Sequence, residues 1–123
     1  MDEPFDPILD AMAEFDLVLT SHSEGFFPHF TPLWNGARTW IELFGNAPAG
    51  NCMAHLAAMI VQGMFDKYPK QKVIFQEGGY WWIPDLMLRL DDFYMMASGD
   101  IALKWCAGKG AKKPSTQYWR NGA

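Results

Sequence analysis

The chain has 123 residues, a formal net charge of −4 and a sequence pI near 5.2. This length allows one domain at most, and the acidic balance argues against general binding to nucleic acid. Half of the residues are hydrophobic and 15% are aromatic, which predicts more apolar surface than one small domain can bury and therefore a partner surface.

A helix and a buried strand are predicted first. Asp6 and Pro7 are typical of an N-cap and a first-turn proline. An apolar stripe at helical spacing follows, made of Ile8, Leu9, Met12 and Phe15. Residues 17–22 then predict a buried strand, and side-chain alternation places His22 on the same face as Thr20.

The middle of the chain predicts a long loop and a crossover helix. Residues 26–50 are rich in Pro, Gly and aromatic residues, which indicates a loop containing a short helix at residues 39–44. Asn51 is predicted to cap the next helix, which ends at Tyr68 and Pro69. The apolar stripe of this helix is Met53, Leu56, Ala57, Ile60, Val61 and Met64.

A second strand is predicted after Lys72, where the unbroken apolar run Val73, Ile74 and Phe75 suits a parallel strand covered on both faces. Gly78-Gly79 ends this strand, and alternation places Glu77 on the face of Phe75. The two strands and the helix between them form a βαβ unit, expected to be parallel and right-handed. Pro84 begins a further helix.

The C-terminal third continues that helix, in which Asp85 and Arg89 form an i,i+4 ion pair on the outer side. Residues 100–123 predict an irregular segment, within which Ser115 caps a last helical turn.

His22 and Glu77 each follow a buried strand and precede a loop that contains glycine. The carboxyl ends of parallel strands carry the chemistry in α/β folds, and imidazole and carboxylate are usual ligands of catalytic zinc or manganese. Two ligands do not complete a site. Spacing alone favours the plainer alternative, a buried histidine bonded to the backbone and a glutamate that closes a turn.

Other candidates carry weaker signals. His29 lies in the aromatic loop and His55 in the first turn of a helix, where each is expected to pack, or to support a metal ligand. Trp81 and Trp82 could stack on a planar substrate, although core packing is the favoured use. Nucleophilic catalysis finds little support, because Ser21 lacks a Gly-x-Ser-x-Gly elbow.

Cys52 and Cys106 lack CxxC spacing and nearby histidines at zinc-site intervals. Two reduced, packed thiols are therefore expected, which favours the cytoplasm. Neither a signal peptide nor a membrane-spanning helix is predicted.

Several motifs resemble the signature of the amidohydrolase-related (amidohydrolase 2) family of metal-dependent hydrolases and decarboxylases, the group that includes aminocarboxymuconate semialdehyde decarboxylase. The motifs are DKYPKQKVIFQEGG at residues 66–79, WIP at 82–84, LRLD at 88–91, GMF at 63–65, and KPS at 113–115 with Tyr118. The resemblance therefore extends over most of the chain, from about residue 6 to residue 118.

The resemblance implies a (β/α)8 TIM barrel with a metal at its mouth, typically zinc, that activates water or polarises a substrate carboxylate. His22 matches a metal-ligand histidine of the family. Glu77 stands where many of the decarboxylases have a second histidine, so it is expected to bind metal or to move a proton as the catalytic carboxylate. The His-x-His pair of the first strand and the aspartate of the last strand are not found in this sequence.

We therefore expect an α/β fold, namely the central βαβα portion of a TIM barrel spanning residues 1–123, with two parallel strands plus helices. A closed barrel needs eight strands. The expected function is that of a fragment of a metal-dependent hydrolase or decarboxylase (a lyase) acting on a small carboxylated substrate and inactive alone. The alternative is a non-catalytic interaction or oligomerisation module. Expected partners are another copy or a complementing barrel fragment, without nucleic acid or membrane.

Overall fold

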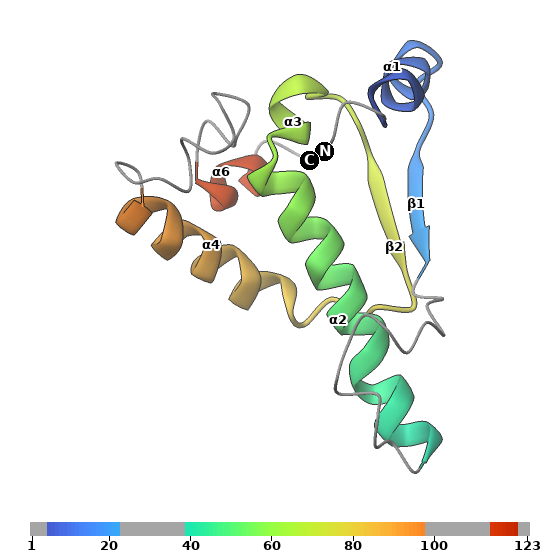
Figure 1. Cartoon of the computed structure of the whole chain (residues 1–123), viewed down its shortest axis with the longest axis vertical. Helices are drawn as coiled ribbons and strands as arrows, with labels where there is room; N and C mark the ends of the chain where they lie inside the picture. The colour runs from blue at the N-terminus through green and yellow to red at the C-terminus, as the bar shows by residue number, and fades with distance from the viewer. Residues whose placement is uncertain (1–4, 23–38, 98–113, 121–123) are drawn as a thin grey trace.

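The computed structural model describes residues 5–22, 39–97 and 114–120. In these ranges the chain forms helices and two strands in the order α1, β1, α2, α3, β2, α4 and α6 (Figure 1). None of the helices in the described ranges is long and apolar enough to cross a membrane.

The first helix, α1 (Asp6–Glu14), begins one residue earlier than expected. Phe5 is its N-cap and Asp6 its first residue, so the prediction that Asp6 caps the helix is wrong. The Asp6 carboxylate instead reaches Lys67, with Oδ2 2.8 Å from Nζ. The proline lies in the first turn as predicted, and Leu9 is the buried residue that packs α1 on the core.

The strands β1 (Leu19–His22) and β2 (Val73–Gln76) are parallel neighbours, as the βαβ pattern predicts. Leu19 pairs with Val73, and His22 with Gln76. Exposure alternates in both strands. The half-buried residues Leu19, Ser21, Val73 and Phe75 form one face, and the exposed residues Thr20, His22, Ile74 and Gln76 form the other.

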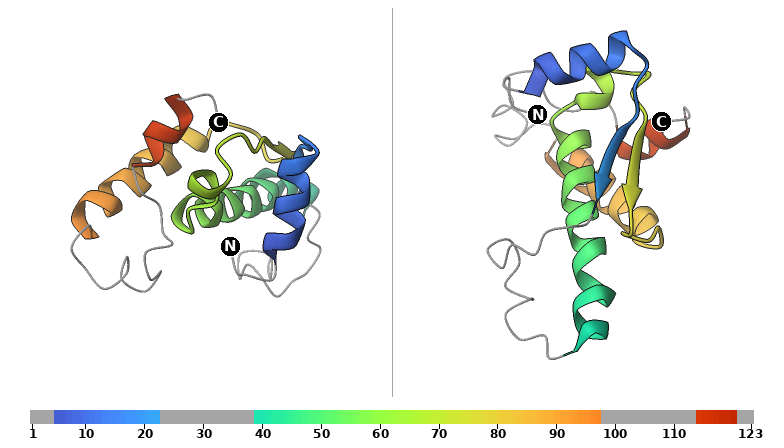
Figure 2. Two further views of the ribbon diagram at one scale, coloured as in Figure 1. Left: turned by 90° about the horizontal axis from the view of Figure 1, so that it is seen from above. Right: turned by 90° about the vertical axis from the view of Figure 1, so that its right-hand side faces the viewer.

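Only the first of these two faces is covered by helices in the described ranges, and the view from the strand side shows β1 and β2 in front of α2 and α4 (Figure 2). Ile74 on the other face is 52% exposed. The expectation of strands covered on both faces is therefore wrong for this part of the chain. An unbroken apolar run indicates that a strand can be buried, but it does not specify which helices or strands pack on each of its faces. We call the exposed side the open face, defined by Thr20, His22, Ile74 and Gln76.

The crossover helix α2 (Trp40–Val61) is 22 residues long, so two boundary predictions are wrong. Residues 40–50 belong to the helix and not to a loop with a short helix, and Asn51 lies within the helix instead of capping it. The helix continues through Pro48 although proline supplies no N–H for the helical ladder. Cys52, Leu56 and Ile60 recur at helical spacing and are buried, so packing outweighs the local signals to stop.

This helix also ends earlier than expected. Gly63 has a left-handed backbone with φ of 74°, and its N–H donates to the Ile60 carbonyl over 3.0 Å. A separate short helix, α3 (Met64–Lys67), follows and leads to Tyr68. Glycine adopts this conformation without steric cost, so it serves as a helix C-terminus. The single helix predicted up to Tyr68 is therefore two.

Helix α4 (Ile83–Ala97) packs beside α2, with Pro84 in its first turn as predicted. The larger of two core clusters joins α2, α4 and α6 (Ser115–Arg120). Its buried members are Cys52, Leu56, Ile60, Trp82, Leu86, Met87 and Tyr118. Fully burying such a side chain contributes about 1.5–3 kcal/mol. The exposed Asp85–Arg89 pair, at 2.9 Å, matches its prediction but contributes only about 0.3–0.5 kcal/mol.

Helix α6 is fixed to its neighbours by hydrogen bonds. The Ser115 hydroxyl donates its hydrogen to the Asp91 carboxylate, with Oγ 2.6 Å from Oδ1, and the same Oγ lies 2.7 Å from the Met87 carbonyl oxygen. Tyr118 donates to the carboxylate of Asp66. Ser115 is thus the first residue of α6, buried and bonded to α4, which differs from its predicted role as a cap.

Candidate functional site

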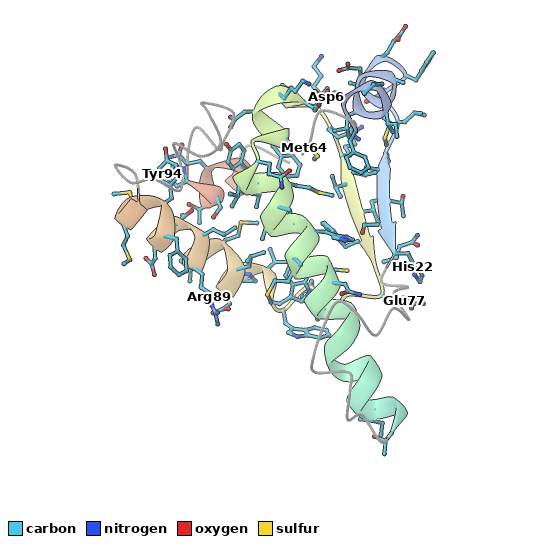
Figure 3. The ribbon with its side chains drawn as sticks, in the orientation of Figure 1. Asp6, His22, Met64, Glu77, Arg89 and Tyr94 are labelled. Carbon is cyan, nitrogen blue, oxygen red and sulfur yellow. The ribbon has the colours of Figure 1, made fainter. Side chains whose placement is uncertain are left out.

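His22 and Glu77 lie side by side where the two strands end (Figure 3). His22 is the last residue of β1, and Glu77 directly follows the last residue of β2. The His22 Nε2 atom is 3.8 Å from the Glu77 Oε1 atom. The sequence therefore predicted two residues that the fold brings together, from strands separated by a long crossover.

The route by which Glu77 reaches His22 differs from the predicted one. Because His22 pairs with Gln76, strict alternation would send Glu77 to the helix-covered face, away from His22. Glu77 has φ of 61°, in the left-handed region. This turn ends the alternation and leaves the carboxylate beside the imidazole. The prediction that Glu77 shares the face of Phe75 is wrong for this reason.

A left-handed backbone at a residue other than glycine is uncommon and costs about 1–2 kcal/mol. Glutamate is not among the residue types enriched in this conformation. Strained backbones of this kind cluster at functional sites, where the surrounding structure holds them in place. The conformation of Glu77, which brings about the 3.8 Å approach to His22, is thus an unusual feature that marks the end of β2.

Both side chains of the pair are accessible to solvent, with 36% of His22 and 59% of Glu77 exposed. His22 is therefore not the buried histidine of the plainer alternative. Even a fully charged pair of exposed side chains contributes at most about 1 kcal/mol to folding. The contact between His22 and Glu77 therefore stabilises the fold only slightly, and stability alone does not explain why the two side chains lie together.

His55 makes a contact that the sequence did not reveal. Its Nδ1 atom is 2.9 Å from the Ser21 hydroxyl oxygen, so a hydrogen bond joins α2 to β1 at the residue before His22. Ser21 is on the helix-covered face, opposite to His22. Side-chain alternation along β1 is enough to predict that Ser21 faces α2. Which residue of α2 contacts Ser21 depends on how the helix packs on the strand. His55 thus contacts β1 from its helix-covered face.

The two tryptophans have different environments. Trp82 is 4% exposed, its Nε1–H donates to the Gly78 carbonyl over 2.7 Å, and its ring packs edge-on against Phe75. It is therefore a core residue. Trp81 is 67% exposed and packs edge-on against the exposed Tyr80, so it is the member of the pair that a substrate can reach. His29 lies outside the described residues.

The donor chemistry of the His22–Glu77 pair suits a divalent metal, because neutral imidazole and carboxylate bind zinc and manganese. Within the residues that the structure describes, however, no three or more His, Cys, Asp or Glu side chains form a group that could hold an ion. Cys52 does not add a thiolate, since burial raises the pKa of its thiol. The described residues therefore supply half of a four-ligand set.

Comparison with known proteins points to one family. A family model described as amidohydrolase matches residues 1–118. No curated protein matches the chain. The match covers both strands, with His22 and Glu77, the helices from α1 to α4, and the first part of α6.

Proposed function

The chain belongs to the amidohydrolase family, and on this premise we propose that it is the central βαβα portion of a metal-dependent hydrolase or decarboxylase barrel. The family match indicates a metal-dependent hydrolase-like domain, and the mixture of helices with two parallel strands fits part of a TIM barrel. The observation that carries the proposal is the His22–Glu77 pair at the carboxyl ends of the strands, where barrels of this kind place their chemistry.

The position of the open face supports this assignment. In a (β/α)8 barrel, helices cover the outer face of the strands and side chains of the inner face line the barrel. Helices cover the Leu19 and Phe75 side of this sheet, whereas His22 belongs to the opposite side. His22 would then face the inside of the barrel at its mouth, with Glu77 next to it.

We assign His22 as a metal ligand and Glu77 as a ligand or as the carboxylate that moves a proton. Zinc is the proposed metal and manganese the second choice; when bound, such an ion activates water or polarises a substrate carboxylate. The proposed substrate is a small carboxylated molecule, aromatic ones included, as for members similar to aminocarboxymuconate semialdehyde decarboxylase. The exposed Trp81 supplies an aromatic surface four residues after Glu77. The cytoplasm remains the proposed location.

The chain alone is proposed to be inactive, since the described residues supply only two ligands. Equilibrium dialysis against zinc or manganese tests the assignment of the pair. We expect binding that is lost in His22→Ala and Glu77→Gln and kept in Glu14→Gln, which removes an exposed carboxylate from α1. Equal binding by wild type and His22→Ala would overturn the assignment, and turnover of carboxylated substrates by the chain would overturn the proposed inactivity.

A second candidate function is a non-catalytic interaction module. It is supported by exposed apolar side chains on two surfaces, Ile74 on the open face and Leu88 and Met95 on α4. Exposed apolar surface and strand edges favour association with another chain. Light scattering separates this function from the first, because a module of this kind associates whether or not metal is present.

A further inference from the structure

A cavity of about 410 Å³ lies between the end of α1 and the connection from α3 to β2. Its lining includes Leu17, which precedes β1, and Gln71, which precedes β2, so the cavity is at the amino ends of the two parallel strands. His22 and Glu77 lie at the carboxyl ends, away from Asp6 of α1 (Figure 3). Small-molecule sites have volumes of roughly 300–1,000 Å³. The cavity is therefore a candidate binding site separate from the His22–Glu77 pair.

Gln71 brings a buried hydrogen-bond acceptor to this cavity. It is 6% exposed, and its Nε2 atom donates to the carbonyls of Leu17 and Lys72 over 2.9 Å and 3.0 Å. These two bonds use both amide hydrogens and so fix which end of the amide is the oxygen. The Oε1 atom has no hydrogen-bond partner in the described part of the chain, although buried polar atoms usually have one. A ligand with an N–H group would supply the missing donor.

The walls of the cavity are partly apolar and adjustable. Met12, Leu17 and Pro69 contribute hydrocarbon surface. The Oε1 atom of Gln71 is closed to solvent in this structure, so a donor reaches it when a lining side chain moves. Met12 is half-buried, and the unbranched methionine side chain changes rotamer easily. A ligand for this cavity would therefore combine an apolar part with a hydrogen-bond donor.

Asp16 and Lys70 add one charge of each sign to the lining. Lys67, which also lines the cavity, is already paired with Asp6. The lysine ion pairs of the described ranges involve Lys67 and Lys72 and not Lys70. Asp16 is 80% exposed, and its Oδ2 atom is 3.9 Å from the Lys72 Nζ atom, which is too long for a hydrogen bond. Asp16 and Lys70 are therefore available to a ligand that carries both an ammonium and a carboxylate group.

The backbone holds Asp16 at the cavity. Helix α1 ends in a Schellman motif, in which the Leu17 N–H donates to the Met12 carbonyl over 2.8 Å and the Asp16 N–H donates to the Ala13 carbonyl. Asp16 has φ of 50°, in the left-handed position of the motif that is usually glycine. Aspartate tolerates this conformation. Unlike glycine, it adds a carboxylate to the cavity.

We propose that this cavity binds a small zwitterion of the α-amino acid type with an apolar side chain, a function beyond the one proposed above. The carboxylate of the ligand pairs with Lys70, and its ammonium group donates to Asp16 and to the Oε1 atom of Gln71. The apolar side chain packs against Met12. In a (β/α)8 barrel the connections from helices to strands lie at the face opposite to the catalytic mouth, so the proposed barrel leaves this cavity accessible.

Isothermal titration calorimetry of the full chain with L-leucine and L-phenylalanine tests this inference. We expect one molecule to bind per chain. The analogues 3-phenylpropanoate and 2-phenylethylamine, which each lack one charge, should bind roughly tenfold more weakly than L-phenylalanine, as expected for the loss of one charge-assisted hydrogen bond. Lys70→Gln and Asp16→Asn should weaken binding by a similar factor. Arg89→Gln and Glu14→Gln remove exposed charges outside the cavity and should bind like the wild type.

A matched pair of alanine variants tests the cavity itself. Ala13 lines the cavity and Ala11 does not, although both are exposed residues of α1. Ala13→Phe should fill the cavity and abolish binding, whereas Ala11→Phe should bind like the wild type. Circular dichroism of each variant confirms that lost binding is not a lost fold.

Each other outcome has a definite meaning. Absence of binding of both amino acids to the wild-type chain would overturn the inference, as would equal binding by Ala13→Phe and the wild type. Binding of 3-phenylpropanoate as tight as that of L-phenylalanine would overturn the assignment of a zwitterion. His22→Ala should bind the amino acids like the wild type, so a failure of the proposed metal role leaves this inference standing.

Discussion

The indole ring of Trp81 lies over the backbone of Gly79. A Cβ atom added to Gly79 would be 2.2 Å from the ring, and Gly79 also has φ of 63°. The positive φ therefore favours glycine at this position, and any side chain there would also displace the Trp81 ring. Trp81 is 67% exposed to solvent, and the missing side chain at Gly79 lets its ring lie against the backbone beside the end of β2.

We expect Gly79→Ala to lower the free energy of unfolding. The left-handed backbone alone costs about 1–2 kcal/mol with a side chain, and displacement of the Trp81 ring adds to that cost. Urea denaturation measures the loss. If Gly79→Ala unfolded at the same urea concentration as the wild type, the contact between Gly79 and Trp81 would not be a feature of the folded protein.

Gly50→Ala should have the opposite effect. Gly50 lies within α2, and a Cβ atom added there would have no neighbour within 4 Å. Alanine is favoured over glycine in a helix by about 0.5–1 kcal/mol, so the variant should be more stable than the wild type by this amount in urea. A loss of stability would indicate that α2 does not continue through residue 50.

The sequence predicted the features that depend on local periodicity. The two strands, their parallel pairing and the helix after Pro84 follow from apolar patterns and a proline. The start of α2 did not follow, because Asn51 carries a local capping signal that burial of the neighbouring Cys52 outweighs. Local propensity is a weak prior wherever packing decides.

The candidate site likewise has features that the sequence predicts and features that only the structure reveals. Each member of the His22–Glu77 pair was evident from its place at a strand end, but the left-handed backbone of Glu77 has no signal in a residue pattern. The contact between Ser21 and His55 spans 34 positions. It depends on how α2 is rotated against the sheet, which side-chain alternation does not specify.

The thiol of Cys52 should be protected in the folded chain. It is 1% exposed, and burial raises its pKa, so little reactive thiolate forms near neutral pH. In a Cys106→Ala background, iodoacetamide should modify Cys52 at least tenfold more slowly without urea than in denaturing urea. Equal rates in the two conditions would show that the core around α2 is open.

Asp91 connects α4 to the C-terminal helix. Its carboxylate accepts hydrogen bonds from the Thr116 backbone N–H and from the hydroxyl groups of Ser115 and Thr116. Partial burial acts to raise the pKa of Asp91, but these hydrogen bonds together outweigh it and leave the pKa below the ordinary value of 3.8. The carboxylate form is therefore the one that holds α6.

Because the pKa of Asp91 is lower in the folded chain, its stabilising contribution is present above about pH 4 and is lost as the pH falls through the folded pKa. Asp91→Asn keeps the shape of the side chain but removes its charge, so we expect a loss of roughly 1–3 kcal/mol at pH 7. The difference from the wild type should shrink toward pH 3. Asp92→Asn, at the exposed neighbouring position, is the control and should unfold like the wild type in urea at pH 7. A difference between Asp91→Asn and wild type that is constant from pH 7 to pH 3 would contradict the role of the charge.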